Sequence, residues 1–212
     1  MSANIVFADG TARLADDIKN FLPNLTIETI FDVGANSGQT LRKLIPAFPD
    51  AKFGETPNVS LHRLALGPKS YEGRVTTRAA STSNALTALT REPTEMVPVR
   101  TGDEFCAENE IFDLSLLKID TEGFDHDVLR GFARMLLEGR IDIIQVECSM
   151  NPSNRKHVPF ETFKHFLEPM GYKLFGLYEQ VQEFKRRPVL RRSDAVFISE
   201  RCVADNTLEQ AG

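Results

Sequence analysis

The sequence predicts a single α/β domain with a doubly wound, mainly parallel sheet and an antiparallel strand pair at one edge. Three observations predict it. Apolar strand patterns alternate with amphipathic helix patterns along most of the chain. Residues 114–119 and 141–146 are nearly continuous apolar runs, as expected for strands that helices cover on both faces. Finally, no helical pattern separates the last two strand segments, residues 172–178 and 195–199, so these are expected to pair antiparallel.

Size and composition fit one globular domain. The chain has 212 residues, of which 42% are hydrophobic and 26% charged. Its net charge of -5 argues against nucleic acid or an anionic membrane as a partner, because such partners usually require a basic face. The first ten residues lack the pattern of a secretory signal, and no apolar run approaches the roughly 18 residues needed to cross a bilayer. Since the three cysteines also show no metal-ligand spacing, we expect a cytoplasmic protein with reduced thiols.

The first half of the chain begins with an expected amphipathic helix. Its apolar residues recur at helical spacing over residues 11–22, and Pro23 stops it. The elements that follow are a strand at 26–33, a glycine turn, a helix from about 39 to 47, strands at 51–53 and 59–66, and short strands around Val75 and at 96–99. We expect the strands at 51–53 and 59–66 to be parallel neighbours.

The second half repeats the alternation of helix and strand. Helices are expected at 101–109, 124–137 and 160–170, and the strands at 114–119 and 141–146 separate them. The dense basic run Lys185, Arg186, Arg187, Arg191 and Arg192 is interpreted as a solvated loop, with contact to an anionic substrate as the alternative.

The first chemical signal is the turn after the strand at 26–33. It carries Asp32, Gly34, Ala35, Asn36, Ser37 and Gly38 at the point where a strand becomes a helix. The two glycines permit a tight turn and a close approach of a ligand to the backbone. Backbone N–H groups of the turn suit a carboxylate, and Asp32 suits an ammonium group. These are the two charges at the methionine end of S-adenosylmethionine, which the turn is therefore expected to bind.

Phosphate-binding turns fit this segment less well. A P-loop needs Lys and then Ser or Thr after its last glycine, and Gln39 and Thr40 stand there. An NAD-binding fingerprint needs three glycines as G-x-G-x-x-G, a spacing that Gly34 and Gly38 do not have. A strand-to-helix turn without any ligand remains the structural alternative.

Acidic residues follow two further strands. Asp120 and Glu122 end the strand at 114–119, and Glu147 ends the strand at 141–146. If these strands are neighbours, Asp120 and Glu147 lie side by side, where they could take the proton of a substrate hydroxyl or hold Mg²⁺. Alternatively, Glu122 is simply an acidic residue at the start of a helix, where it interacts favourably with the helix dipole. The aliphatic part of Lys118 is expected to pack inside the sheet, with its ammonium directed at a carboxylate.

The segments FDVGANSGQT, LLKIDTEGFDHDVLRG and VEC together resemble the FkbM-type methyltransferases, from about residue 31 to 199. The resemblance implies a Rossmann-like class I methyltransferase domain over residues 26–212, with residues 1–25 as a helical segment packed on it. It implies S-adenosylmethionine as methyl donor and a hydroxyl oxygen of a small acceptor, such as a sugar or a polyketide-type natural product, as target. In this resemblance Asp32, Gly34, Asn36 and Gly38 match the donor-binding motif. The acids Asp120, Glu122 and Glu147 match positions around the substrate.

One segment departs from the family pattern. In this family the second strand ends with an acid that binds the donor ribose, and a helix follows. Here Glu55 is the only nearby acid, and only five residues separate Phe53 from Val59, too few for a parallel crossover. We expect a missing segment between Phe53 and Gly54. Two rival functions remain: a non-catalytic binding module that has lost donor binding, and an NAD-dependent oxidoreductase.

Overall fold

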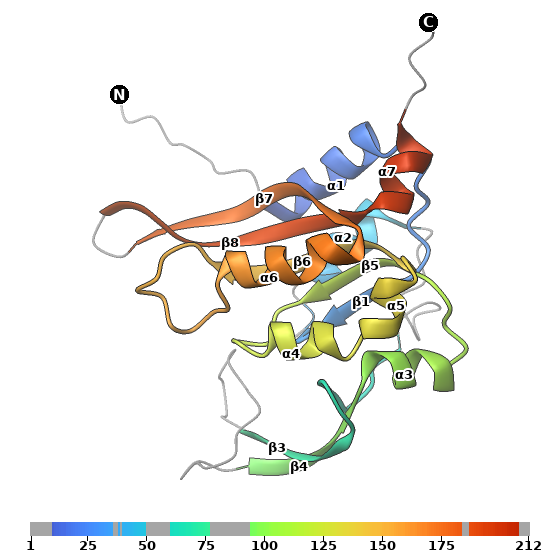
Figure 1. Ribbon diagram of the computed structural model, residues 1–212, viewed down its shortest axis with the longest axis vertical. Coiled ribbons are helices and arrows are strands. Elements are labelled where there is room, and N and C mark those ends of the chain that lie inside the picture. The colour runs from blue at the N-terminus through green and yellow to red at the C-terminus, as the bar shows by residue number, and fades with distance from the viewer. Residues whose placement is uncertain are drawn as a thin grey trace, which may run out of the picture.

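The computed structural model describes residues 10–35, 38, 40–49, 60–76, 94–183 and 187–207. Its main sheet has five strands in the order β1-β5-β6-β8-β7 (Figure 1). The strands are β1 (Ile30–Val33), β5 (Leu114–Ile119), β6 (Ile141–Ser149), β8 (Arg187–Ser199) and β7 (Tyr172–Glu183). The first three run parallel, and β8 and β7 follow antiparallel at the edge. The α/β fold with a mixed sheet, mostly parallel in its core and closed by an antiparallel pair, is as predicted.

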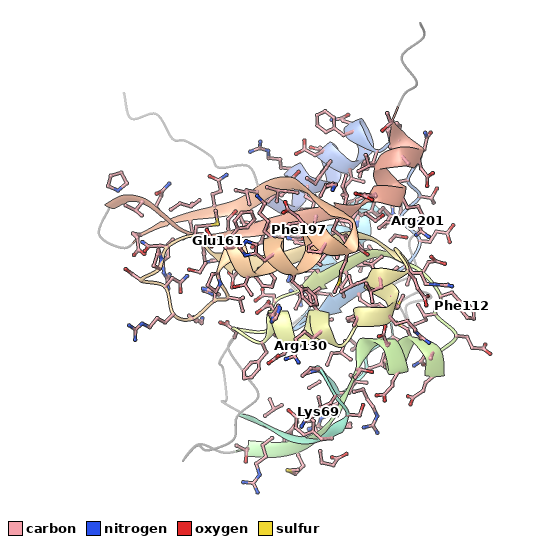
Figure 2. The ribbon with its side chains drawn as sticks, in the orientation of Figure 1. Lys69, Phe112, Arg130, Glu161, Phe197 and Arg201 are labelled. Carbon is pink, nitrogen blue, oxygen red and sulfur yellow. The ribbon has the colours of Figure 1, made fainter. Side chains whose placement is uncertain are left out.

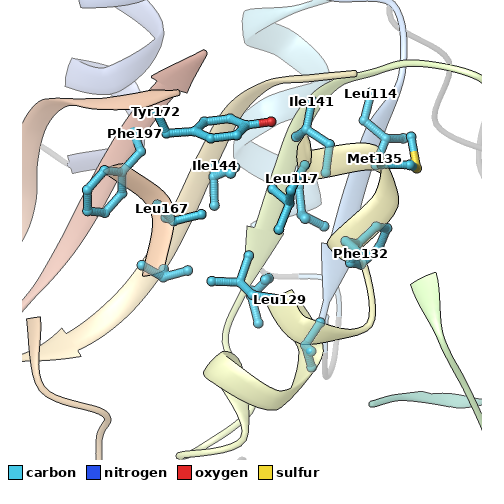
Figure 3. Close-up of a cluster of buried hydrophobic side chains, with 14 of the residues drawn as sticks. Leu114, Leu117, Leu129, Phe132, Met135, Ile141, Ile144, Leu167, Tyr172 and Phe197 are labelled. Carbon is cyan, nitrogen blue, oxygen red and sulfur yellow. The ribbon is translucent and has the colours of Figure 1, made fainter. Parts of the chain in front are cut away.

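Helices pack against this sheet through two separate apolar clusters. On one face, α1 (Gly10–Phe21), α2 (Leu41–Ala47) and α7 (Glu200–Asn206) contribute Leu14, Leu44 and Cys202 to a cluster with the sheet residues Leu116 and Ile143. The other cluster involves α3 (Gly102–Glu108), α4 (Asp125–Arg130), α5 (Ala133–Leu137) and α6 (Phe160–Leu167), the last continued by a 3-10 turn at Glu168–Met170. Figure 3 shows Leu117 and Ile144 of the strands with Leu129 and Leu167 of these helices and Phe132, which lies between α4 and α5.

The helix expected over 124–137 is in fact two helices, α4 and α5. They separate at Gly131, where a Cβ atom would lie 2.3 Å from the carbonyl oxygen of Gly67. The backbone at Gly67, more than sixty positions earlier in the chain, therefore packs against Gly131 where the two helices separate. The local apolar periodicity carries no sign of that contact.

The strand expected over 59–66 is largely wrong. Within the described chain only Ala65–Leu66 (β2) is a strand, and it belongs to a separate three-stranded sheet in the order β2-β4-β3. In that sheet β4 (Thr94–Arg100) pairs parallel with β2 and antiparallel with β3 (Tyr71–Thr76). Residues 60–63 are exposed, so they lack the buried face that would hold a strand against the main sheet.

Several expectations concern residues outside the described part of the chain. These are the strand at 51–53, the missing segment between Phe53 and Gly54, and the candidate donor-binding residues Glu55, Asn36 and Ser37. Among the helices that are described, none is long and apolar enough to cross a membrane.

The register of the main sheet aligns its polar residues. Lys118 on β5 lies opposite Asp32 on β1 and opposite Gln145 on β6. Since side chains in register share a face of the sheet, these three residues form a polar row across β1, β5 and β6. On β8, Asp194 lies opposite Glu147 and extends the row on the same face. This row lies near the carboxyl ends of the three parallel strands β1, β5 and β6.

Candidate functional site

The turn after β1 is packed directly against the end of β5. Gly34 has φ +88°, and a Cβ atom there would lie 1.9 Å from the carbonyl oxygen of Asp120. The amide of Asp120 in turn donates a hydrogen bond of 2.9 Å to the carbonyl of Val33. The structure thus gives Gly34 a packing role that the sequence did not reveal.

Gly38 differs from Gly34 in its surroundings. It also has a positive φ, +73°, but no described atom lies within 4 Å of the place where its Cβ would be. Its amide donates to the carbonyl of Ala35 at 2.7 Å, and its own carbonyl accepts from Arg42 at 3.1 Å. Among the described atoms, Gly38 therefore lacks the backbone contact that Gly34 makes.

Lys118 bridges the ends of β1 and β5. Its Nζ atom lies 3.5 Å from Asp32 Oδ1 and 3.5 Å from Asp120 Oδ2. The side chains of Asp32 and Lys118 are only 2% and 8% exposed, whereas that of Asp120 is 42% exposed. Burial raises the pKa of Asp32, although Lys118 opposes this. Burial also disfavours the Lys118 ammonium, but the surrounding aspartates outweigh it and raise the pKa of Lys118 overall. The prediction that Lys118 packs its stem and points at a carboxylate is confirmed.

The polar row continues into β6 and β8. Gln145 Nε2 donates a hydrogen bond of 2.7 Å to Asp194 Oδ2. Burial raises the pKa of Asp194 to about 7, with Gln145 and Lys118 opposing the shift. Both carboxylate oxygens of Asp32 and the Gln145 oxygen are buried without a hydrogen-bond partner in the described chain. Among the described residues, the row thus contains acceptors that no described donor satisfies.

The loop after β5 is held by a buried acid. Asp125, 1% exposed, accepts hydrogen bonds from the amides of Thr121 at 3.2 Å and Gly123 at 3.1 Å. These bonds fix a turn in which Glu122 has φ 56° and Gly123 has φ 104°. Burial raises the pKa of Asp125 to about 6, against the effect of the backbone hydrogen bonds. Asp125 therefore shapes the loop that presents Asp120 and Glu122.

Glu147 is held by residues from two other segments. His157 Nε2 lies 2.7 Å from Glu147 Oε2, and Arg192 of β8 pairs with Oε1. On its other side, the His157 ring places Nδ1 2.9 Å from Asn154 Nδ2. Burial opposes ionisation of Glu147, but His157 and Arg192 outweigh it and lower the pKa of this carboxyl. Glu147 is consequently a firmly ionised and fully engaged carboxylate.

A family profile, the methyltransferase FkbM domain, matches residues 32–174, more than half of the chain. The chain belongs to the FkbM methyltransferase family. The FkbM methyltransferase of Methylobacillus flagellatus KT has a similar structure, with a TM-score of 0.52 and 14% identity; the match covers 81% of this chain and 43% of that one. A pericyclic reaction enzyme matches with a TM-score of 0.39 and 13% identity, covering 88% of this chain and 46% of its own. This FkbM-family chain thus spans less than half the length of both structures. No curated protein sequence matches it.

The structure of this FkbM-family chain brings together most of the predicted acids. Asp32 and Asp120 share the Lys118 ammonium, and Glu147 continues the same face of the sheet. Glu122 is directed elsewhere, since its Oε2 pairs with Lys156 Nζ at 2.6 Å. Each acid that was considered for Mg²⁺ already has a cationic partner.

The described residues also contain no group of three or more potential metal ligands. They do not fit a Mg²⁺ site, because Asp120 and Glu147 would have to exchange Lys118 and Arg192 for the ion. No catalytic step is therefore assigned to a metal in this part of the chain.

Four residues of this region were missed or misinterpreted from the sequence. Arg192 was assigned to a solvated basic loop, but it pairs with Glu147. Asp194 and His157 carry no motif, and their positions follow only from strand register and from the loop after β6. Asp125 looked like an ordinary acid in the first turn of a helix, although it is buried and holds the preceding loop.

Proposed function

We propose that this chain is an S-adenosylmethionine-dependent methyltransferase. Membership of the FkbM family supports the reaction class. One structural observation carries the assignment of the methyl donor: two carboxylates, Asp32 and Asp120, share the single ammonium of Lys118 where the β1 turn meets the end of β5. Two carboxylates beside one ammonium leave negative charge at this place, which suits the ammonium group of the donor.

The fit to the donor extends to the turn itself. The turn lies at the carboxyl end of β1, and ligands of open α/β sheets bind outside the carboxyl ends of the strands. When bound, S-adenosylmethionine supplies an electrophilic methyl group on a sulfonium. We further propose that the complete sheet is doubly wound and Rossmann-like, in keeping with helices packed through separate clusters on its two faces.

The proposed acceptor is a hydroxyl oxygen of a small molecule, such as a sugar or a natural-product-like compound. Holding the reacting atoms aligned can by itself contribute roughly 7–11 kcal/mol to catalysis. The Asp120 side chain is 42% exposed, so its carboxylate is accessible to either substrate, as a partner for the donor's ammonium or as a hydrogen-bond acceptor for the hydroxyl. Glu147, ionised and held by Arg192 and His157, is better suited to orient polar groups than to remove a proton.

Titration calorimetry with S-adenosylhomocysteine and, separately, with NAD tests the proposal. We expect binding of S-adenosylhomocysteine and none of NAD. Transfer of a labelled methyl group to a panel of hydroxylated acceptors, with and without EDTA, then tests the reaction and its independence of metal. Binding of NAD alone would instead support an oxidoreductase.

A non-catalytic binding module is the second candidate function. It is favoured by the short second unit of the sequence, where only five residues separate Phe53 from Val59, and within the described residues β1 pairs only with β5. This candidate predicts a folded protein that binds no S-adenosylhomocysteine. The same calorimetric experiment therefore decides between the two.

A further inference from the structure

The two acids that meet at the β1–β5 junction differ sharply in accessibility. The Asp32 side chain is buried, with 2% of its surface exposed, whereas the Asp120 side chain is 42% exposed. A ligand arriving from solvent can reach Asp120 without any rearrangement. It could reach Asp32 only by displacing the groups that bury it.

Lys118 forms ion pairs with both of these acids. Its ammonium lies at the same distance, 3.5 Å, from an oxygen of each, so one positive charge is divided between two negative ones. Neither Asp32 oxygen has a hydrogen-bond partner in the described chain. An ammonium group that binds Asp120 from outside would leave Lys118 free to pair fully with Asp32, which would neutralise both acids.

The two glycines of the turn differ in what lies at the Cβ position. At Gly34 the backbone of Asp120 fills it, so the turn is packed directly against the end of β5. At Gly38 no described atom lies within 4 Å of that position. The strand end that bears Asp120 is therefore held against the turn through Gly34.

We propose that the methyl-donor site is built in two layers. Asp32 and Lys118 form a buried layer that positions the turn, and Asp120 forms the outer layer that contacts the ligand. In this arrangement Asp120 binds the ammonium group of the donor. The inference rests on the proposed function, because it assumes that S-adenosylmethionine occupies this edge.

Asparagine substitutions at matched positions test the arrangement by calorimetry, with S-adenosylhomocysteine as the probe. We expect Asp120→Asn to bind it at least tenfold more weakly than the unaltered protein. We expect Asp32→Asn to lower the unfolding temperature, because the buried Lys118 ammonium loses the more buried of its two carboxylate partners, and to weaken binding less than Asp120→Asn does. Asp127→Asn is the control, since Asp127 is similarly exposed, at 44%, and pairs only with Arg130 among the interactions described.

A second probe identifies the group that Asp120 contacts. 5′-Methylthioadenosine lacks the amino-acid end of S-adenosylhomocysteine, so Asp120→Asn is expected to change its affinity less than threefold. A tenfold loss for both probes would show that Asp120 acts on the fold of the site and not on the ammonium, and would overturn the inference.

The Asp120→Asn result stands even if Asp32→Asn does not fold. Unchanged affinity of Asp120→Asn for S-adenosylhomocysteine, or a folded Asp32→Asn that loses more affinity than Asp120→Asn, would also overturn the two-layer site. Failure of the proposed function gives a different result, because the unaltered protein itself would then bind no S-adenosylhomocysteine.

Discussion

The α-carbon of Gly34 faces the carbonyl oxygen of Asp120 so closely that a methyl group on residue 34 would lie 1.9 Å from it. The two residues are more than eighty positions apart in sequence, and each belongs to a different strand end. Their contact, the Val33–Asp120 hydrogen bond and the shared Lys118 ammonium fix the two halves of the proposed site to each other.

This contact makes Gly34 sensitive to the smallest side chain. Gly34→Ala combines a left-handed backbone with a backbone collision, so we expect the free energy of unfolding to fall by roughly 2–5 kcal/mol. Urea denaturation measures the loss. The control is Gly139→Ala, where φ is +63° but no described atom lies within 4 Å of the added carbon, so a loss of only about 1–2 kcal/mol is expected. Equal losses at both positions would show that the contact with Asp120 is unimportant.

Asp125 should be necessary for the loop that carries Glu122. Asp125→Ala removes the acceptor of two amide groups, and hydrogen bonds to a charged group contribute about 1.5–3 kcal/mol. We expect a loss of stability in that range together with faster hydrogen exchange of the Gly123 amide. Asp125→Asn retains one acceptor oxygen and should lose less. An unchanged exchange rate in the alanine variant would contradict this role.

The Glu147 pair should stabilise the protein in a pH-dependent manner. The folded pKa of Glu147 is lowered, so its contribution is present above the ordinary glutamate value of 4.5 and is lost as the pH falls through the folded value. Glu147→Gln should therefore be less stable than the unaltered protein by about 1.5–3 kcal/mol at pH 7, with the difference shrinking below pH 4.5.

Denaturation at several pH values with a second glutamine variant completes this test. Glu138 pairs with Arg140 at 2.6 Å, but both side chains are 41–46% exposed, so Glu138→Gln should change stability by no more than about 1 kcal/mol. A Glu147→Gln difference that did not vary with pH would argue against an ionised pair.

Asp194 should have the opposite pH dependence. Its folded pKa is raised to about 7 from 3.8, so the folded state holds a proton that the unfolded state releases. The stability associated with this residue is present below pH 3.8 and is lost as the pH rises through about 7. Asp194→Asn removes that dependence, so it should gain stability relative to the unaltered protein between pH 5 and pH 8. A gain that is constant over this range would contradict the raised pKa.

The fold was largely predictable because it depends on local patterns. Apolar runs at 114–119 and 141–146 identified the buried strands, and their acidic ends located Asp120 and Glu147 on one edge. The break between α4 and α5 was not predictable, because it depends on Gly67 packing against Gly131. Contacts of this kind join distant segments and leave no periodicity in either one.

The candidate site was predictable only in part, for the same reason. Motif spacing identifies Asp32 and the glycine turn, but it cannot show that Lys118 pairs with both Asp32 and Asp120 or that Gly34 packs against the Asp120 backbone. Arg192 and Asp194 acquire their partners through the antiparallel register of β8 with β6, which sequence alone does not fix.

Some charged side chains serve the opposite end of the sheet. Arg201 of α7, labelled in Figure 2, pairs with Asp113 at 3.1 Å and Asp142 at 2.9 Å, at the amino ends of β5 and β6. Arg201 thus ties the last described helix to strands that precede it by about sixty positions or more.

The insertion of β8 between β6 and β7 affects the order in which the molecule can assemble. During synthesis β6 emerges about forty residues before its neighbour β8, and until then one of its edges can pair with any extended chain. The same delay applies to Gln145 and Glu147, whose partners Asp194 and Arg192 arrive only with that strand. A fragment that stops after β7 would contain most of the family signature, yet the edge of β6 that pairs with β8 would remain unpaired. Nascent chains of this protein should therefore depend on rapid completion, or on a chaperone, to avoid aggregation.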